Sequence, residues 1–253
     1  MTRNKISIFG VEILNVTFEE SAKILKEFLQ ENKLHTIVTP NTEIVMACKK
    51  DEKLKNLIND QDLVIPDGIG LVIGSKIRKK PLKERVTGFD ISMELIKIAH
   101  EEGYSLYLLG GEPGIALQAQ KKLQESFPGL DIVGTQHGYF KGTHLGQKGH
   151  PEELAVIADI NEKKPDIIFL GLGFPKQEIW IEEYRNKLKS KIIIGNGGVL
   201  DVIAGKSKRA PEIFIKLNLE WLYRLLKDPS RIKRQMAIPK FLFSIMTDKD
   251  AVK

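Results

Sequence analysis

Two turns of the sequence place polar side chains directly after runs of branched aliphatic residues. Thr39 and Asn41 follow one such run, and Asp67 follows another. A carboxylate at the end of a buried strand can take a proton from a substrate hydroxyl, as a general base does. Asparagine and aspartate are also frequent helix N-caps, and Asp-Gly is a common turn sequence. Asp67 is therefore a candidate catalytic base at the rim of a pocket, and helix capping is the alternative.

Two glycine-rich turns are suited to close approach of a phosphate or a sugar to backbone N–H groups. They are Gly110-Gly-Glu-Pro-Gly114 and Gly195-Asn-Gly-Gly198, and each precedes an expected helix. Neither has the three-glycine dinucleotide fingerprint, nor the lysine and hydroxyl residue of a P-loop. These turns therefore disfavour a dehydrogenase and an ATPase, while tight turns without a ligand remain the alternative. The candidate binding residues are Gly110, Gly111, Asn196 and Gly197.

A third glycine-containing turn, Gly171-Leu-Gly-Phe-Pro-Lys-Gln-Glu178, places Gln177 in the first turn of an expected helix. There its amide can point into a cleft, although a structural role is equally consistent with the sequence. Arg85 precedes another expected helix start and supplies a cation, although an exposed arginine is usually only solvated.

No metal site is expected. Asp60-Gln-Asp62 has the Asp-x-Asp spelling of a divalent-metal ligand pair, but it precedes the strand at Leu63, whereas such pairs normally follow one. A turn that caps the preceding helix fits it better. His137, His144 and His150 share one glycine-rich loop without the spacing of zinc ligands, so we expect them at the surface.

Positive charge is concentrated at the end of the chain. The net charge is +6, whereas residues 206–253 contain 12 lysine and arginine residues against 5 acidic ones. Lys216, Arg224 and Lys227 would lie within roughly 60° of one another on a single helix. Such a face attracts phosphates in lipids, nucleic acids or a diphosphate leaving group, and plain solvation is the alternative. No groove-reading module is recognisable, whereas the apolar segment 241–246 favours contact with a membrane surface.

These residues need a scaffold in which strand ends meet. Short aliphatic runs alternate with amphipathic stretches, which predicts a Rossmann-like α/β fold with a mostly parallel sheet between helices. Ligands bind at the carboxyl ends of the strands in such sheets. We expect an α/β core over residues 1–204 and a basic, helical, membrane-associating appendage over 205–253, with one helix spanning about Glu212–Lys227.

Composition sets the remaining limits. The hydrophobic fraction of 42% and charged fraction of 28% are those of a globular protein, not a disordered or fibrous one. The only cysteine, Cys48, cannot form an intramolecular disulfide, and the first residues do not resemble a secretion signal. No apolar run approaches the length of about 20 residues needed to cross a bilayer. We therefore expect a cytoplasmic protein that meets membranes only at their surface.

Taken in order, six motifs resemble those of the WecG/TagA/CpsF family of bacterial glycosyltransferases over about residues 6–234. The motifs are Thr39-Pro-Asn41, Pro66-Asp-Gly68, Arg85-Val-Thr-Gly-Phe-Asp90, Gly110-Gly-Glu-Pro-Gly114, Gly171-Leu-Gly-Phe-Pro-Lys-Gln-Glu178 and Lys208-Arg-Ala-Pro211. The ending Leu219-Glu-Trp-Leu-Tyr-Arg224, followed by Arg231 and Arg234, is especially similar to the wall teichoic acid branch.

The resemblance implies an inverting, metal-independent glycosyltransferase without a cofactor. Its donor would be UDP-N-acetylmannosamine, and its acceptor the 4-hydroxyl of N-acetylglucosamine on undecaprenyl diphosphate at the inner face of the cell membrane. Asp67 would be the general base. Substrate would contact Thr39, Asn41, Arg85 and Gln177, and the diphosphate would be held by Arg224, Arg231 and Arg234. The family analogy also suggests self-association, and no nucleic-acid partner is expected.

Other readings remain open from the sequence. A related transferase could use UDP-N-acetylmannosaminuronic acid or UDP-glucose for a different surface polysaccharide. A nucleotide-dependent oxidoreductase is disfavoured by the missing third glycine. A non-catalytic module that binds anionic lipid or nucleic acid through the basic tail would bind in a strongly salt-dependent way and release no UDP.

Overall fold

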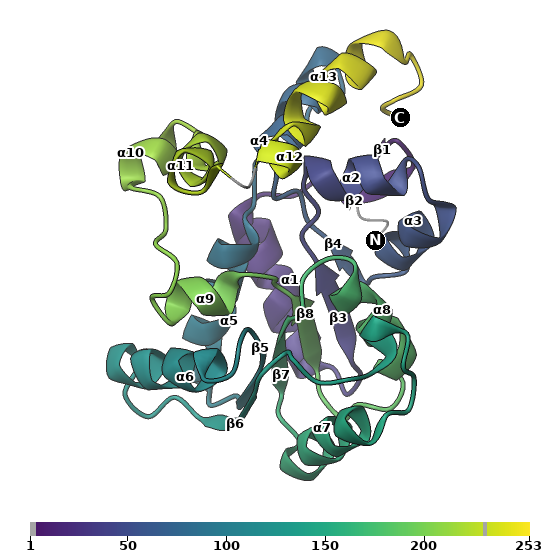
Figure 1. Ribbon diagram of the computed structural model, residues 1–253. Helices are drawn as coiled ribbons and strands as arrows, with labels where there is room; N and C mark the ends of the chain where they lie inside the picture. The colour runs from purple at the N-terminus through teal and green to yellow at the C-terminus, as the bar shows by residue number, and fades with distance from the viewer. Residues whose placement is uncertain (1–3, 230–231) are drawn as a thin grey trace.

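The centre of the structure is a sheet of six parallel strands (Figure 1). The computed structural model describes residues 4–229 and 232–253. Along the sheet the strands are β4 (Leu63–Val64), β3 (His35–Val38), β8 (Ile192–Gly195), β7 (Ile167–Gly171), β5 (Leu106–Gly110) and β6 (Ile132–Gln136). All neighbouring pairs run parallel. The predicted α/β fold is confirmed. The strand β6, at one edge of the sheet, was not predicted, because Gly134 interrupts its aliphatic residues.

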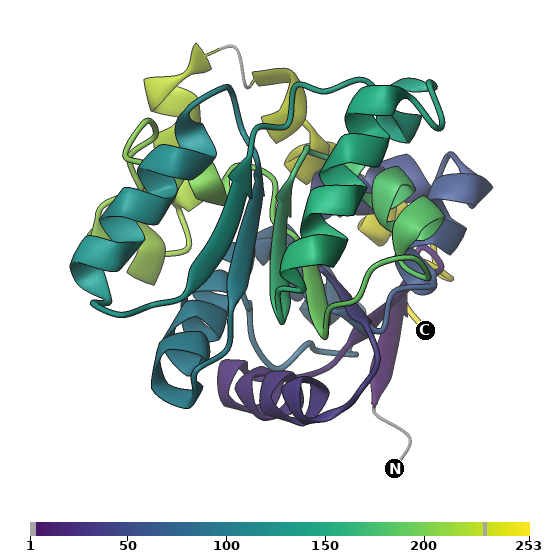
Figure 2. The ribbon, with the colours of Figure 1, turned by 90° about the horizontal axis from the view of Figure 1, so that it is seen from below.

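Helices cover both faces of the sheet (Figure 2). One face packs against α1 (Phe18–Gln30), α5 (Gly88–Glu102), α6 (Ile115–Ser126) and α9 (Val199–Ile203). The other packs against α7 (Pro151–Lys163) and α8 (Lys176–Tyr184). Successive side chains of a strand point to opposite faces. In β8, Ile192 and Ile194 therefore join the first cluster, and Ile193 joins the second.

A third apolar cluster lies at the β4 end of the sheet. It includes the antiparallel hairpin of β1 (Lys5–Ile8) and β2 (Val11–Leu14), which packs with α2 (Thr42–Cys48), α3 (Glu52–Asn59) and α4 (Ile69–Ile77). Thr17 and Glu20 form a capping box at the start of α1. Short, capped elements thus position the turns after β3 and β4.

The final helix, α13 (Ala237–Thr247), is packed into this third cluster. Phe241 and Ile245 are fully buried against α4. A Cβ added at Gly74 of α4 would lie only 2.7 Å from the Phe241 ring, so the close approach requires glycine. The end of the chain adds an antiparallel bridge between Val252 and Ile8. The expectation that Phe241 and Ile245 face a membrane is therefore wrong, because they complete the core.

The basic segment before α13 is not one helix. It forms α10 (Glu212–Lys216) and α11 (Glu220–Lys227), with Asn218 between them in the left-handed conformation at φ 58°. Asparagine tolerates this conformation better than most residues, so the chain can reverse direction there. The predicted continuous helix over Glu212–Lys227 is therefore wrong, and the predicted common face of Lys216 with Arg224 is lost.

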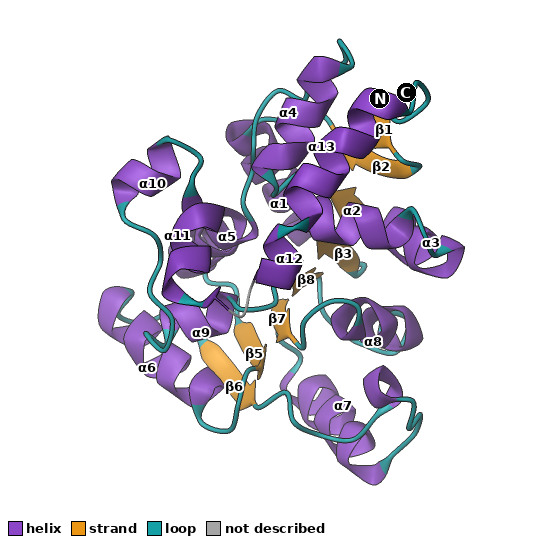
Figure 3. Cartoon of the chain, turned by 45° about the horizontal axis from the view of Figure 1, so that its top comes forward, coloured by secondary structure: helices purple, strands orange, loops and turns teal. Residues whose placement is uncertain are grey.

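Two short helices lie over the carboxyl ends of the strands. Figure 3 shows α12 (Ile232–Gln235) above the ends of the central strands, and residues of both α11 and α12 line the pocket at these ends. Within the described residues, no helix combines the length and the apolar character needed to span a bilayer. The last fifth of the chain thus supplies a cover for one edge of the sheet and a helix that packs into the core behind it.

Candidate active site

A pocket of about 1230 Å³ opens at the carboxyl edge of the sheet. It is lined by the turns that follow all six strands and by residues of α11 and α12, because parallel strands direct all these turns to one edge. Most of the residues that the sequence singled out line it, namely Thr39, Asn41, Asp67, Arg85, Gly111, Gln177, Asn196, Gly197, Arg224 and Arg234.

Asp67 lies in the turn between β4 and α4. The N-cap of α4 is Gly68 and has no side-chain cap, so the Asp67 carboxylate does not cap this helix. Its Oδ2 accepts a hydrogen bond from the backbone N–H of Gly88 at 3.3 Å, and its side chain is 29% exposed. The carboxylate is thus held at the pocket wall and still open to it.

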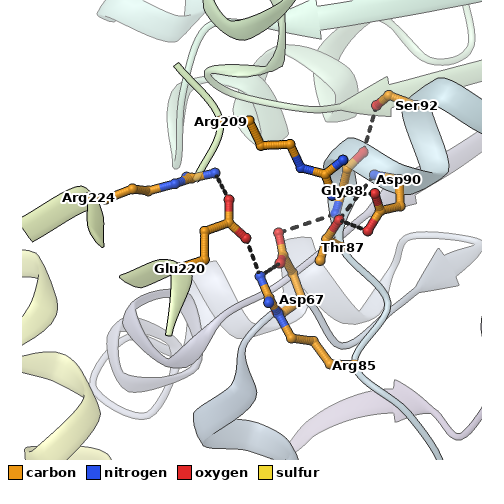
Figure 4. A network of polar contacts seen from close by, with 9 residues as sticks. All are labelled: Asp67, Arg85, Thr87, Gly88, Asp90, Ser92, Arg209, Glu220 and Arg224. Carbon is orange, nitrogen blue, oxygen red and sulfur yellow. Dashed lines mark hydrogen bonds and ion pairs between the residues drawn. The ribbon is translucent and has the colours of Figure 1, made fainter. Parts of the chain in front are cut away.

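Arg85 binds Asp67 at two points (Figure 4). Its Nε donates to the Asp67 carbonyl at 2.7 Å, and its Nη2 lies 3.5 Å from Asp67 Oδ1. The same Nη2 donates to Glu220 Oε2 at 2.9 Å, and the other oxygen of Glu220 accepts from Arg224. Four charged side chains therefore form one chain of contacts from the β4 turn to α11.

The charges of this network act against each other. Burial raises the pKa of Asp67 above its ordinary value of 3.8; Arg85, the Gly88 N–H and Arg224 act in the opposite direction, and Glu220 adds to the increase. Burial also disfavours ionised Glu220, but Arg224 and Arg85 hold its pKa below its ordinary value. A carboxyl whose proton affinity is increased in this way is a better base than an exposed aspartate.

Thr39 and Asn41 lie beside Asp67, in the turn after β3. Asn41 is the N-cap of α2, and its Oδ1 accepts from Ile44 N at 3.1 Å. The capping alternative thus holds for Asn41, although the residue also lines the pocket. Thr39 is 9% exposed, and a Cβ at Gly88 would lie 2.6 Å from its Oγ1. Gly88 therefore allows α5 to begin directly against this turn.

Gln177 joins two of the glycine turns. Its Oε1 accepts from the backbone N–H groups of Gly173 and Gly197, each at 3.2 Å, and its Nε2 donates to Glu178 Oε1 at 2.9 Å. The side chain lines the pocket at 4% exposure. Its amide positions the β7 and β8 turns, a role that the sequence did not reveal; its contact with substrate stays a prediction.

Glu178 supports Gln177 from the protein interior. The carboxyl is 1% exposed, and its Oε2 has no hydrogen-bond partner. Burial raises its pKa to about 7, although the hydrogen bond from Gln177 acts in the opposite direction. The sequence gives no signal for this role, because a glutamate in the first turn of a helix usually faces solvent.

The remaining glycine-turn candidates differ in position. Gly110 is absent from the described residues that line the pocket, and a Cβ there would lie 2.6 Å from the backbone of Gly171. It is required for the close approach of β5 and β7, beneath the pocket floor. Asn196 lines the pocket at 6% exposure, and its Nδ2 donates to Ser92 Oγ at 3.2 Å.

The three predicted diphosphate-binding arginines are not equivalent. Arg224 lines the pocket and is paired with Glu220. Arg234 also lines it, is 67% exposed, and lies 3.7 Å from Glu43 of α2. Arg231 lies outside the described residues. Two of the three arginines thus line the pocket, one from α11 and one from α12.

Buried contacts hold the loop after β6 in place, which the sequence does not suggest. Glu153 is fully buried and accepts hydrogen bonds from Thr143 N, Gly149 N and the Tyr184 hydroxyl. This closes the loop, and His144 becomes 6% exposed against the Phe140 ring. The expectation of a surface His144 is therefore wrong, because a buried carboxylate organises the loop around it. His144 also lines the pocket.

The Asp-x-Asp sequence lies at the opposite edge of the sheet. Asp60 caps the end of α3, and Asp62 Oδ2 accepts from the backbone N–H and the hydroxyl of Thr36. Asp62 also pairs with Arg185 at 3.3 Å. The described residues contain no cluster of three or more His, Cys, Asp or Glu side chains arranged to hold a metal ion.

Known proteins resemble the whole chain. The model of the Glycosyl transferase WecG/TagA/CpsF family matches residues 6–252. Similar proteins from Staphylococcus aureus strains MRSA252, MW2 and NCTC 8325 / PS 47 are each named N-acetylglucosaminyldiphosphoundecaprenol N-acetyl-beta-D-mannosaminyltransferase. Each is 38% identical over 251 residues, which cover 98% of this chain and 95% of the relative.

The buried Glu178 predicts a pH-dependent stability. Its pKa is about 7 in the folded protein and 4.5 ordinarily, so the native state binds the proton more tightly. The free energy of unfolding should therefore fall as pH rises through this interval and level off above it. Glu178→Gln keeps an acceptor for Gln177 but cannot ionise. Urea unfolding at pH 5 and pH 8 measures how much free energy of unfolding is lost between the two pH values. This loss should be smaller in Glu178→Gln than in the wild type by roughly 2 kcal/mol.

Glu182→Gln, which changes an exposed residue of the same helix, is the matched control and should follow the wild type at both pH values. If the stability of the wild type and of Glu178→Gln depended on pH equally, this result would contradict a raised pKa of the buried Glu178 carboxyl.

Proposed function

Because the chain belongs to the Glycosyl transferase WecG/TagA/CpsF family, we propose that it transfers N-acetylmannosamine from UDP-N-acetylmannosamine to N-acetylglucosamine on undecaprenyl diphosphate. The reaction would be a step in the synthesis of the wall teichoic acid linkage unit. The relatives named above support this choice of sugar and acceptor. The observation that carries the mechanism is the half-buried carboxylate of Asp67 at the wall of a large pocket, beside Arg85.

In the proposed reaction, Asp67 takes the proton of the acceptor 4-hydroxyl. The oxygen then forms a bond to the anomeric carbon of the donor sugar, and the bond between that carbon and the UDP oxygen breaks. Attack from the side opposite the leaving group inverts the anomeric configuration. Partial burial suits Asp67 to this step because its proton affinity is raised. Arg85 Nε, which donates to the Asp67 carbonyl, and the Gly88 N–H, which donates to the carboxylate, hold Asp67 in place during the transfer.

The departing UDP carries growing negative charge. We propose that arginine side chains stabilise this charge. Arg224 and Arg234 both line the pocket, and guanidinium groups bind phosphate oxygens in pairs. Arg231 is included in this proposal only on the basis of the sequence. We propose that these groups do the work of a divalent cation, so that transfer proceeds without a metal. Thr39 and Asn41, next to Asp67, are proposed to bind the reacting sugars.

The acceptor carries a long hydrocarbon chain, so the enzyme would have to work at a membrane surface. Exposed apolar side chains on α10, α11 and the turn between them stand next to the pocket, namely Ile213, Leu217 and Leu226. The exposed cations Lys216 and Lys227 lie among them. This combination of apolar and basic side chains is typical of interfacial binding to anionic lipid. We propose peripheral attachment to the cytoplasmic face of the membrane through this surface.

A UDP-release screen tests the substrate assignment. The acceptor is a short-chain lipid diphosphate carrying N-acetylglucosamine, and a chelator is present throughout. We expect acceptor-dependent release of UDP with UDP-N-acetylmannosamine above that with UDP-N-acetylmannosaminuronic acid or UDP-glucose. Preference for another donor would refute the assigned sugar. Loss of activity in the chelator, restored by Mg²⁺, would refute catalysis without a metal.

Asp67→Asn tests the base. The amide cannot take up the proton, so turnover should fall by roughly 10²- to 10⁴-fold, while donor binding, measured by calorimetry, stays close to that of the wild type. Asp60→Asn changes an exposed aspartate at the opposite edge of the sheet and is the matched control. Near-normal turnover of a folded Asp67→Asn enzyme would remove Asp67 from the mechanism.

Membrane attachment can be measured by co-sedimentation with vesicles that contain anionic lipid. Replacing Ile213, Leu217 and Leu226 together by serine should reduce the bound fraction several-fold, because apolar area that enters the membrane interface is lost. Leu117 and Leu154 are exposed on α6 and α7. Their replacement by serine is the matched control and should leave binding unchanged. Equal binding of both variants would contradict attachment through α10 and α11.

A further inference from the structure

Arg85 is shared unequally between two carboxylates (Figure 4). Its Nη2 lies 2.9 Å from Glu220 Oε2 and 3.5 Å from Asp67 Oδ1. Its Nε is fixed at 2.7 Å on the Asp67 carbonyl. The guanidinium is therefore attached to the Asp67 backbone, and its terminal nitrogen lies closer to Glu220 than to the carboxylate of the proposed base.

The position of this terminal nitrogen matters for catalysis. An arginine in a direct, close pair with a carboxylate stabilises the ionised form, so the carboxylate becomes a weaker base. Arg85 is 14% exposed, and a charge pair in such a place is poorly screened by solvent. A second carboxylate that attracts the arginine would reverse part of this effect. Glu220 is in the position to do so.

We propose that Glu220 is a positioning residue, which draws the Arg85 guanidinium away from the Asp67 carboxylate and thereby keeps Asp67 able to accept the acceptor's proton. The inference rests on the proposed function of Asp67 as the base. In this proposal Glu220 acts through Arg85 and not directly on the reacting atoms.

The contacts of Glu220 support this role. Its side chain is 6% exposed, and its two oxygens accept one hydrogen bond each, from Arg85 and from Arg224. The charged groups that act on Asp67 are Arg85 before α5, and Glu220 and Arg224 of α11; the Gly88 N–H adds a hydrogen bond. Of these, only Glu220 is negative, so it alone opposes the two arginines.

Glu220 also links two parts of the chain that are far apart in sequence. It is the first residue of α11, whereas Arg85 precedes α5 and Asp67 follows β4. The basicity of Asp67 thus depends on how α11 is placed over the pocket. Removal of α11 would then release Arg85 from Glu220 as well as remove Arg224 from the pocket wall.

Two substitutions of the same ion-pair network should shift the proton affinity of Asp67 in opposite directions. Glu220→Gln removes the negative charge and leaves Arg85 free to pair with Asp67, so the pKa of Asp67 should fall, by roughly one unit. Arg224→Gln removes a cation and leaves Glu220 attached to Arg85 alone, so the pKa of Asp67 should rise. A structural role of the network would damage both variants without giving shifts of opposite sign.

The pKa is measured directly by ¹³C NMR titration of the aspartate carboxyl carbons, with Asp67→Asn used to assign the resonance. In the transfer assay, the acidic limb of kcat/KM should move to lower pH in Glu220→Gln. Its plateau should fall about threefold, as expected for a weaker general base. Glu212→Gln, which changes an exposed glutamate of α10 paired with Lys216, is the matched control and should keep the wild-type titration and profile.

An unchanged Asp67 titration in Glu220→Gln, or shifts of the same sign in both variants, would overturn the inference. The titration needs no turnover, so it tests Glu220 even if none of the sugar nucleotides reacts, an outcome that would count against the proposed function. Active transfer with an unshifted Asp67 would overturn the role of Glu220 and leave the proposed function in place.

Discussion

The parallel direction of the six strands is the constraint on which the site depends. Because every strand ends at the same edge, turns from distant parts of the sequence come together there. Asp67 after β4, Gly111 after β5, Gln177 after β7 and Asn196 after β8 thus line one pocket. The opposite edge receives Asp62, whose carboxylate holds Thr36. A polar residue next to a strand can therefore contribute to this pocket only if it lies at the carboxyl end of that strand.

Close approach of backbones sets the floor of the pocket. Gly110 allows β5 to meet Gly171, and Gly88 allows α5 to start against Thr39. The Gln177 amide then fixes two glycine turns, with the buried carboxyl of Glu178 behind it. Flexible turns become a defined surface only because a buried amide satisfies their N–H groups. The conformational freedom of glycine is thus combined with side-chain bonds that restrict it.

The charged network connects this floor to the cover. Arg85 holds the Asp67 backbone, Glu220 holds Arg85, and Arg224 holds Glu220. Carboxylates and guanidinium groups alternate along the network, so each buried charge has an opposite neighbour. The helix α11 is therefore joined to the pocket edge of the sheet by ionic contacts, while α13 is joined to the core by the apolar contacts of Phe241 and Ile245. Within the C-terminal segment, α11 and α13 therefore serve different purposes.

The sequence by itself determined the fold class and most residues of the pocket, because aliphatic runs followed by glycine, asparagine and aspartate report strands and their carboxyl ends locally. It could not separate Asn41, which caps the helix that follows it, from Asp67, which does not cap the helix that follows it, since both residue types favour either position. It also missed the roles of Glu178, His144 and Glu220. Their burial and partners arise from chain segments up to 135 positions apart, as for Arg85 and Glu220. Such long-range pairings are decided only when the tertiary structure brings the segments together, because no local pattern encodes which distant charge a side chain will meet.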